Sequence, residues 1–212
     1  MGQKMKSVSL AAIMLLSTLS VLLVAAPVAA TQVVITEAIQ VVDSGSSNDR
    51  MAAVAADSEG NVHVIWSRNF QHLYYSMISP RGETMIDATQ VSNSGLHKIF
   101  HPDMVIDEDD KVHIVWADHS GQHKIMYTAL NPFNTAMDGS VADDGTLSAI
   151  DDTIIAQHVN DRDWPAIDVD SRGNIHIVWQ DNYDSLDLYF QQPQIYYTMF
   201  EPDYGTQNVI TL

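Results

Sequence analysis

The chain of 212 residues contains no cysteine. Disulfides and thiol catalysis are therefore excluded, and stability must come from packing. Basic residues are also scarce, because 10 lysines and arginines stand against 27 aspartates and glutamates, for a net charge of −17. Such an acidic surface repels nucleic acid, so we expect no polynucleotide partner. Beyond residue 30, no stretch is apolar enough to span a bilayer, and none has the periodicity of an amphipathic helix.

The first thirty residues have the pattern of a secretory signal peptide. Lys4 and Lys6 precede an apolar run from Val8 to Ala26, and small residues at 28–30 suit a cleavage site. The alternative is an uncleaved N-terminal anchor, since the run is almost long enough to span a membrane. We expect cleavage, after which residues 31–212 have no membrane span and are secreted or held at the cell surface.

One sequence segment of ten residues occurs three times in the rest of the chain. It leads from an Asp through a Val/Ile-His-Val/Ile-Val/Ile run to a Trp. The copies lie at residues 57–66, 107–116 and 170–179. A repeat of this length indicates one supersecondary module that is copied and stacked. Its β-branched and aromatic residues, bounded by Asp, Gly and Asn, predict a strand after a tight turn. Gly60 and Gly173 suit a turn with positive φ, whereas Asp110 in the middle copy predicts a slightly different turn.

Each repeat divides into four strand-like pieces. The third is an aromatic run such as Leu73 to Ile78, and the fourth is weaker, as at Thr89 to Val91. Four short strands in ~40–50 residues match the size of a propeller blade. We therefore predict an all-β fold of propeller type with three four-stranded blades, in a ring that is incomplete or completed by an oligomer. The expected blades are residues 51–92, 101–156 and 164–212, with an orphan strand at 33–42 and the last fourth strand at 207–212.

The third copy has the most regular pattern. It reads Pro-x-Ile-x-Val-Asp-x-x-Gly-Asn-Ile-His-Ile-Val-Trp-x-Asp and continues with Ile-Tyr-Tyr-Thr, within residues 164–181 and 195–198. This pattern resembles the repeat of sialidase-like β-propeller proteins, which are often exported by archaea and bacteria, and the similarity covers roughly residues 39–212. The spacing does not match the sialidase Asp-box, because Gly173 follows Asp170 by three residues. The resemblance implies a propeller fold, and one such fold hosts many functions.

Closed propellers typically have four to eight blades. With three recognised here, two explanations compete: the chain is part of a longer propeller, or two copies combine into a six-bladed ring. Blades that stay open would expose apolar end faces and invite self-association.

The repeated histidines and tryptophans have structural interpretations. The histidines are His63, His113 and His176, and the tryptophans are Trp66, Trp116 and Trp179. Equivalent residues of successive blades are too far apart around an axis to share one zinc ion, so we expect packed histidines with local hydrogen bonds. The tryptophans end the same strand in every copy. We therefore expect them to fill the space between blades rather than stack on sugars.

Ligands of propellers usually meet the loops at one end of the ring. In this chain that end would carry the loops between second and third strands and those between blades. Basic residues beside carboxylates there could bind a polar ligand, and the alternative is a set of turn-capping aspartates with solvated arginines. The candidate ligand-binding residues are Arg50, Arg68, Asp118, Arg162, Asp163, Trp164 and Asp181.

No catalytic set can be assembled from this sequence. A sialidase needs an arginine cluster, a tyrosine–glutamate pair and an aspartic acid/base. Residues 31–212 contain only five arginines, and no glutamate in this range lies in an expected loop between second and third strands. Paired carboxylates with assigned roles are missing as well. We predict no metal site and no cofactor. The Asp/Gly-rich segment 137–145 could bind calcium, although its spacing does not fit an EF-hand and a flexible loop is the alternative.

These observations favour an exported propeller-type binding or scaffolding module whose partner is a glycan or a cell-surface protein. The alternative is a fragment of a sialidase-like glycoside hydrolase whose catalytic blades are missing. A third interpretation is a structural spacer without a ligand.

Overall fold

The computed structural model divides the chain into residues 1–38 and residues 39–212. It describes residues 38–43, 45–92, 97–133, 148–150, 152–157, 162–181 and 194–202. Every helix or strand assigned in this part of the chain is a β-strand, which confirms the all-β prediction. The same residues include no helix that is long and apolar enough to cross a membrane. The predicted signal peptide lies outside the described residues.

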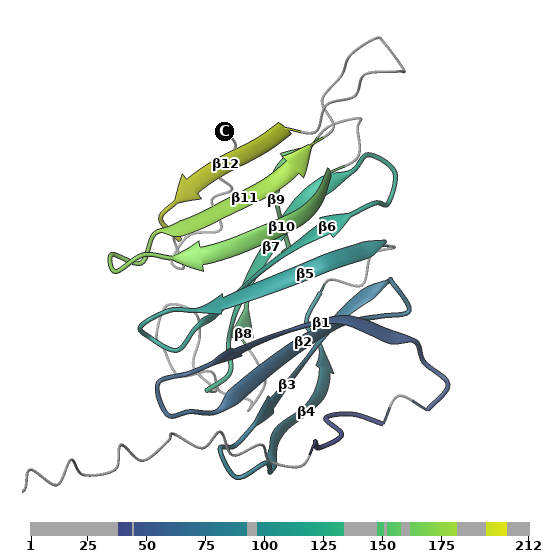
Figure 1. Cartoon of the computed structure of the whole chain (residues 1–212), viewed down its shortest axis with the longest axis vertical. Helices are drawn as coiled ribbons and strands as arrows, with labels where there is room; N and C mark the ends of the chain where they lie inside the picture. The colour runs from purple at the N-terminus through teal and green to yellow at the C-terminus, as the bar shows by residue number, and fades with distance from the viewer. Residues whose placement is uncertain are drawn as a thin grey trace, which may run out of the picture. The chain divides into compact units, whose positions relative to one another are not determined.

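Blade 1 is a four-stranded antiparallel sheet in which the strands pair in chain order (Figure 1). Its strands are β1 (Asp49–Ala56), β2 (Val62–Arg68), β3 (His72–Ile78) and β4 (Thr84–Gln90). The first three agree with the predicted pieces. The fourth begins earlier than the weak piece at Thr89, because Thr84 to Ala88 pair with β3 although they expose most of their side chains.

Blades 2 and 3 repeat the same antiparallel order. Blade 2 consists of β5 (Ile99–Ile106), β6 (Val112–Asp118), β7 (Lys124–Asn131), β8 (Ser148–Ala149) and β9 (Thr153–Gln157), and both β8 and β9 pair with β7. Blade 3 consists of β10 (Arg162–Val169), β11 (Ile175–Asp181) and β12 (Gln194–Phe200). Blade 1 therefore has the four strands predicted, and in blade 2 β8 and β9 share the fourth position, because they pair with successive parts of the same edge of β7. Blade 3 has three strands among the described residues. The fourth strand predicted over 207–212 lies outside the described residues.

The orphan strand predicted at 33–42 is not found where the structure can test it. Residues 38–43 form no strand, and residues 33–37 lie outside the described part of the chain. The Gln40 side chain donates a hydrogen bond to the Val42 carbonyl two residues on, at 3.0 Å, a local contact of a bent chain rather than of a ladder. Ile39 lies beside Gly82, in the turn that precedes β4, instead of pairing with a sheet edge.

The blades pack through their first strands and through two apolar clusters. Figure 1 shows β1, β5 and β10 side by side, with β5 in the middle. One cluster joins blade 1 to blade 2, with Ile65 and Tyr75 against Ile114 and Trp116. The other cluster joins blades 2 and 3. The three repeated tryptophans are at most 7% exposed, as expected for residues that fill the space between blades. Successive sheets with adjoining first strands and apolar faces packed together are propeller-type blades.

The turn between first and second strands explains why the Asp of the repeat recurs. The Asp57 carboxylate accepts hydrogen bonds from the backbone N–H groups of Glu59 and Asn61, at 3.0 and 2.8 Å. Gly60 closes this turn with a φ of 82°. Asp110 takes the glycine position in blade 2 with a φ of 60°, so its turn has the same handedness and the expected difference in conformation is small. An aspartate tolerates the left-handed region better than most residues.

Asp110 also links two blades. Its carboxylate oxygens accept hydrogen bonds from the backbone N–H and the hydroxyl of Ser58 in blade 1, at 2.8 and 2.7 Å. A glycine could not make this contact. The substitution in the middle copy therefore adds a polar bridge between blades 1 and 2.

Candidate functional site

Each blade has a β-bulge at the same place in its first strand. In blade 1 the register moves from the pair Arg50–Ser67 to the pair Ala53–Ile65, so that two residues of β1 oppose the single residue Trp66 of β2. The registers of β5 and β10 break in the same way, opposite Trp116 and Trp179. Bulges of this kind redirect side chains and are frequent beside functional sites.

The first residue of each bulge has a left-handed backbone although it is not glycine. The φ values are 56° at Met51, 46° at His101 and 49° at Trp164. Such conformations cost roughly 1–3 kcal/mol each and persist only where the surrounding structure imposes them. The next residue is Pro102 in β5 and Pro165 in β10. Proline is tolerated there because a bulge residue is left out of the hydrogen-bond ladder.

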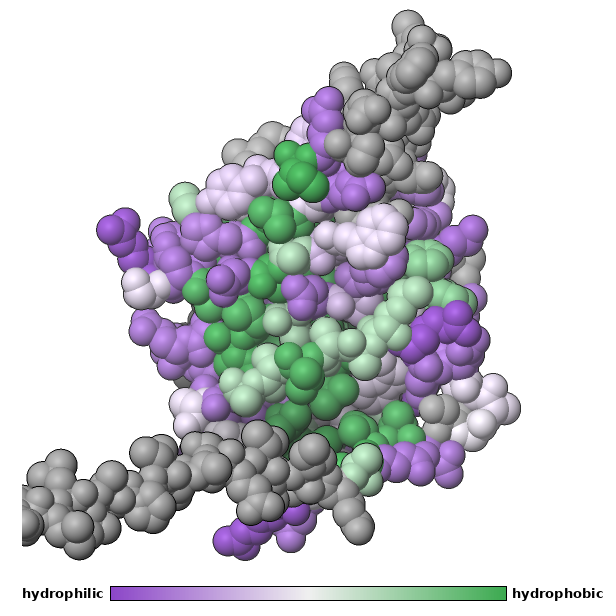
Figure 2. All heavy atoms as spheres, in the orientation of Figure 1, coloured by the Kyte–Doolittle hydropathy of each residue, from purple (hydrophilic) through white to green (hydrophobic). Residues whose placement is uncertain are grey.

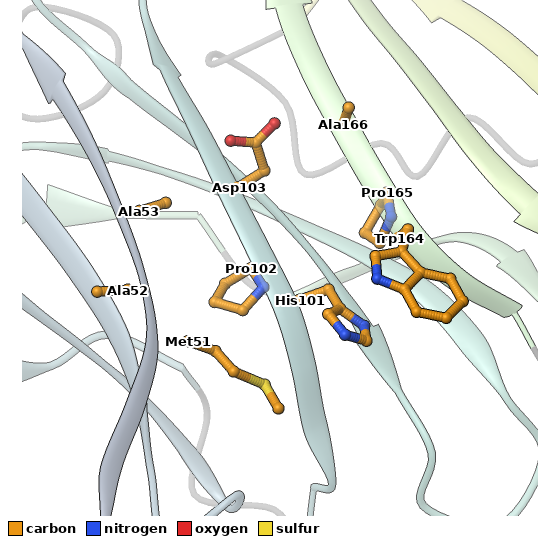
Figure 3. Close-up of a pocket in the computed structure, with 9 residues that line it drawn as sticks. All are labelled: Met51, Ala52, Ala53, His101, Pro102, Asp103, Trp164, Pro165 and Ala166. Carbon is orange, nitrogen blue, oxygen red and sulfur yellow. The ribbon is translucent and has the colours of Figure 1, made fainter.

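The three bulges together line an open cleft of about 460 Å³, here called the bulge cleft (Figure 3). Its walls are three consecutive residues from each first strand: Met51–Ala53, His101–Asp103 and Trp164–Ala166. The lining residues belong to β1, β5 and β10, the strands that lie side by side on the face turned to the viewer in Figure 1. Figure 2 shows apolar side chains gathered across the middle of that face, with polar residues around its margins.

Two aromatic rings form one wall of the bulge cleft. The Trp164 indole lies over the His101 imidazole, with 4.8 Å between ring centroids and 28° between planes, and Figure 3 shows the two rings next to each other. Trp164 is 57% exposed, whereas the three repeated tryptophans are buried. An indole held against a second ring with one face open is a flat apolar platform with a polar N–H at its edge.

Asp103 is the single carboxylate among the nine residues that line the bulge cleft. It accepts a hydrogen bond from the backbone N–H of Ile167 at 3.1 Å, and this contact ties β5 to β10. The cleft therefore combines a ring platform, small apolar side chains and one fixed acceptor. Such a mixture of apolar lining and few polar groups is typical of small-molecule sites.

The residues predicted to bind a ligand all lie in strands at one end of the blades. They open the first strands or close the second strands, on the side where the bulges are. Arg68 makes two hydrogen bonds to Asp49, at 2.7 and 2.8 Å, and lies over the Tyr74 ring at 4.1 Å. Arg50 donates to Asn48 at 3.0 Å and covers the Phe70 ring at 4.1 Å.

Asp118 and Asp181 hold the same register position in blades 2 and 3, and each is 1% exposed. Asp118 accepts hydrogen bonds from the N–H groups of Lys98 and Ser120, at 3.0 and 2.8 Å, and pairs with His97 at 2.9 Å. Burial alone would raise the pKa of Asp118, but these hydrogen bonds hold it below its ordinary value. These contacts are those of a capping aspartate.

Arg162 and Asp163 begin β10, where the register sets them opposite Asp181 and Gln180. In blade 1 the two residue types are exchanged between the strands, because the aspartate, Asp49, lies in the first strand and the arginine opposite it, Arg68, lies in the second. Of the seven predicted residues, only Trp164 lines the bulge cleft. Ligand binding by all seven, Trp164 included, stays a prediction.

Each repeated histidine lies between an Asp and a Tyr and has a hydrogen bond with the Tyr hydroxyl, as was expected of packed histidines, and in blades 1 and 2 a hydrogen bond to the Asp completes the chain. In blade 1, His63 Nε2 lies 3.2 Å from Asp57 Oδ2, and His63 Nδ1 lies 2.8 Å from the Tyr75 hydroxyl. Blade 2 repeats the chain with His113, at 3.1 and 2.8 Å. In blade 3 His176 Nδ1 lies 2.8 Å from the Tyr197 hydroxyl, and Nε2 lies 3.4 Å from Asp170 Oδ2 without a hydrogen bond between them.

The chain of blade 1 has a definite direction of proton donation. Burial lowers the pKa of His63, although Asp57 partly offsets the effect. Burial would raise the pKa of Asp57, but hydrogen bonds from Asn61 and His63 hold it below its ordinary value. A neutral imidazole beside an ionised carboxylate donates through Nε2, so the Tyr75 hydroxyl donates to Nδ1. Burial also raises the pKa of Tyr75, which keeps that hydroxyl protonated.

The sequence did not point to Met51 or Asp103 as parts of a site. The available signal was the proline shared by the first strands of blades 2 and 3, next to the bulge residue. The calcium candidate 137–145 lies outside the described residues. Within the described part of the chain, no group of three or more His, Asp and Glu side chains is placed to hold a metal ion.

Comparison with known proteins identifies no family. No family model and no curated protein matches this chain. Among solved structures, an endo-arabinase from Bacteroides thetaiotaomicron VPI-5482 aligns with a TM-score of 0.44 and 14% sequence identity, over 74% of this chain. The chain spans 57% of that protein's length. The assignment of propeller-type blades rests on the strand topology and packing described above.

Proposed function

We propose that this protein is an exported propeller-type module that binds a glycan in the bulge cleft. The observation that supports the proposal is the exposed Trp164 ring, backed by His101 and set beside the fixed acceptor Asp103. The apolar face of a sugar ring packs on an open indole face, while its hydroxyls can reach a neighbouring carboxylate. The net charge of −17 adds to this, because it disfavours polyanionic ligands.

Binding is favoured over hydrolysis by the composition of the bulge cleft. Hydrolysis of a glycosidic bond ordinarily requires two carboxyl groups on either side of the scissile bond. The lining of the bulge cleft offers one, Asp103, and its carboxylate is engaged with the Ile167 N–H. The alternative, a glycoside hydrolase fragment, would need a second carboxyl group from outside this lining.

The test is a titration of intrinsic tryptophan fluorescence with a panel of neutral and acidic oligosaccharides. Because Trp164 is the exposed tryptophan of the four, a bound sugar should change its emission. We expect Trp164→Ala to weaken binding at least about tenfold, which corresponds to about 1.4 kcal/mol. Met85→Ala removes an exposed apolar side chain from β4, outside the cleft, and should bind like the parent.

Two outcomes would count against the proposal. One is the absence of a saturable signal with any saccharide of the panel. The other is binding that survives Trp164→Ala unchanged, which would move the site away from the bulge cleft. Release of reducing ends from any saccharide, abolished by Asp103→Asn, would favour the hydrolase alternative.

A further inference from the structure

Blade 3 carries an apolar face that no described residue of another blade covers. It consists of Val178 from β11 and of Ile195, Tyr197 and Met199 from β12, here called the distal face of blade 3. These side chains are 39%, 74%, 58% and 48% exposed. Four adjacent apolar side chains on one side of a sheet form the kind of patch that marks an interaction surface.

The corresponding residues of the other two blades are buried. The strand registers identify them, because Trp179 opposes Tyr196 as Trp66 opposes Tyr74 and Trp116 opposes Met126. In blade 1 they are Ile65, Leu73, Tyr75 and Met77, each at most 3% exposed. In blade 2 they are Val115, Ile125, Tyr127 and Ala129, each at most 2% exposed.

We call the corresponding residues of blades 1 and 2 the distal faces of those blades. Within this chain, both of these distal faces are covered by the same kind of surface. The distal face of blade 1 packs against the opposite face of blade 2, here called the near side of that blade. This near side consists of Met104, Val112, Ile114, Trp116 and Met126. The distal face of blade 2 packs against Ile167, Ile175, Ile177 and Trp179 of blade 3, with Tyr196 beside them. The covering surface is therefore a first-strand residue, two second-strand aliphatics, the repeated tryptophan and a third-strand residue.

Blade 1 carries the corresponding set of residues, and in the described part of the chain no further blade packs on them. By register its members are Val54, Val62, Val64, Trp66 and Tyr74. Val54 is 65% exposed, whereas its counterparts Met104 and Ile167 are 6% and 9% exposed. Val62, Val64 and Tyr74 are partly exposed and Trp66 is 3% exposed, so blade 1 carries the same set of residues with Val54 as its exposed member.

We propose that the distal face of blade 3 docks on the near side of blade 1 in a second copy of this chain. The contact is head-to-tail, so that each copy uses two different surfaces. Two copies that make the contact reciprocally bring six blades together, within the range of four to eight for closed propellers. The apolar side chains of both surfaces then leave water, as their counterparts do inside the chain.

The experiment measures oligomeric mass by light scattering over a dilution series of the full chain, with the mass per copy fixed by mass spectrometry. We expect twice the mass per copy for the parent. Ile195→Asp and Val54→Asp each place a carboxylate in the contact, and both should give a single copy. Met85→Asp alters another exposed apolar residue, 51% exposed and outside both surfaces, and should leave the dimer intact. All three positions are exposed, so folding of each copy is retained, as circular dichroism will verify.

A cross-linking experiment determines which surfaces meet. Because the chain has no cysteine, cysteines introduced at Val54 and Ile195 are the only thiols present. A short bismaleimide should join copies of the Val54→Cys, Ile195→Cys double variant and should not join copies of either single variant. A parent that stays a single copy overturns the proposal, as does a dimer that persists in Ile195→Asp. A dimer lost in Ile195→Asp but kept in Val54→Asp also overturns the head-to-tail arrangement.

Discussion

The hydrogen bond between the repeated His and a Tyr hydroxyl occurs in all three blades at different degrees of burial, so the same Tyr-to-Phe substitution can be compared between blades. In blade 1 the His63 and Tyr75 side chains are fully buried, with the hydroxyl 2.8 Å from Nδ1. In blade 3 the same 2.8 Å contact joins His176 to Tyr197, which is 58% exposed. We predict that replacing Tyr by Phe destabilises the protein in blade 1 far more than in blade 3.

The magnitude follows from what the missing hydroxyl leaves behind. Tyr75→Phe keeps the ring and its packing but leaves the buried His63 Nδ1 without a donor, which costs about 1–3 kcal/mol. In Tyr197→Phe, water can reach the partly exposed His176 imidazole in place of the lost hydroxyl, so the change should stay within about 0.5 kcal/mol. With a urea m-value of about 2 kcal/mol/M, Tyr75→Phe lowers the unfolding midpoint by about 0.5–1.5 M.

The assay is urea unfolding followed by circular dichroism. Both variants are made in the Ile195→Asp background, because a docked second copy would cover Tyr197. Equal shifts for the two variants, or no shift for Tyr75→Phe, would refute the claim that burial decides the cost of the lost hydrogen bond. A changed m-value would indicate an altered unfolded or native state instead of a lost contact.

Two further predictions concern acidification and the tight turns. Burial lowers the pKa of His63 from 6.5, so below pH 6.5 the unfolded chain binds more protons than the folded chain, and the free energy of unfolding decreases as the pH is lowered. The pKa values of Asp57 and Asp107 are also lowered in the folded chain from 3.8, and these two carboxyl groups add a further loss of stability below pH 3.8. Thermal unfolding should show this decline, and His63→Gln should flatten it between pH 6.5 and 3.8, whereas an unchanged slope would contradict the assignment. Gly173 has a φ of 81° with open space around it, so Gly173→Ala should cost about 1–2 kcal/mol from backbone strain alone. Gly173→Asn, which resembles Asp110 in blade 2, should cost less, and equal losses in urea unfolding would argue against a backbone origin.

Local patterns were sufficient to predict most of the strands. Alternating β-branched and aromatic residues around the repeated Trp predicted the second strands, and the aromatic runs predicted the third strands, as found in β2 and β3. Pattern was least informative at sheet edges. The first half of β4 exposes most of its side chains, so no hydrophobic alternation marks it, and its pairing is decided by β3.

The candidate site could be predicted only in part. Trp164 was identified because it begins a blade at the ligand end, but a bulge opposite the repeated tryptophan has no signature of its own in sequence. The strained backbone of Met51 and His101 arises from the register of each sheet and the contact between neighbouring first strands. Asp103 becomes part of the site only because β10 lies beside β5 and offers it the Ile167 N–H.

By itself, the sequence determined the class of fold, the repeat and its turns, because these depend on short-range chemistry: β-branched runs, an Asp that caps its own turn, and a glycine or aspartate with positive φ. Only the tertiary structure decided which apolar faces are covered and which side chains converge. Ile65, Val115 and Val178 occupy one position of the repeat, yet the first two are buried and the third is 39% exposed. The difference lies in whether another blade stands in front of them, and that is a property of the packed chain that no single repeat contains.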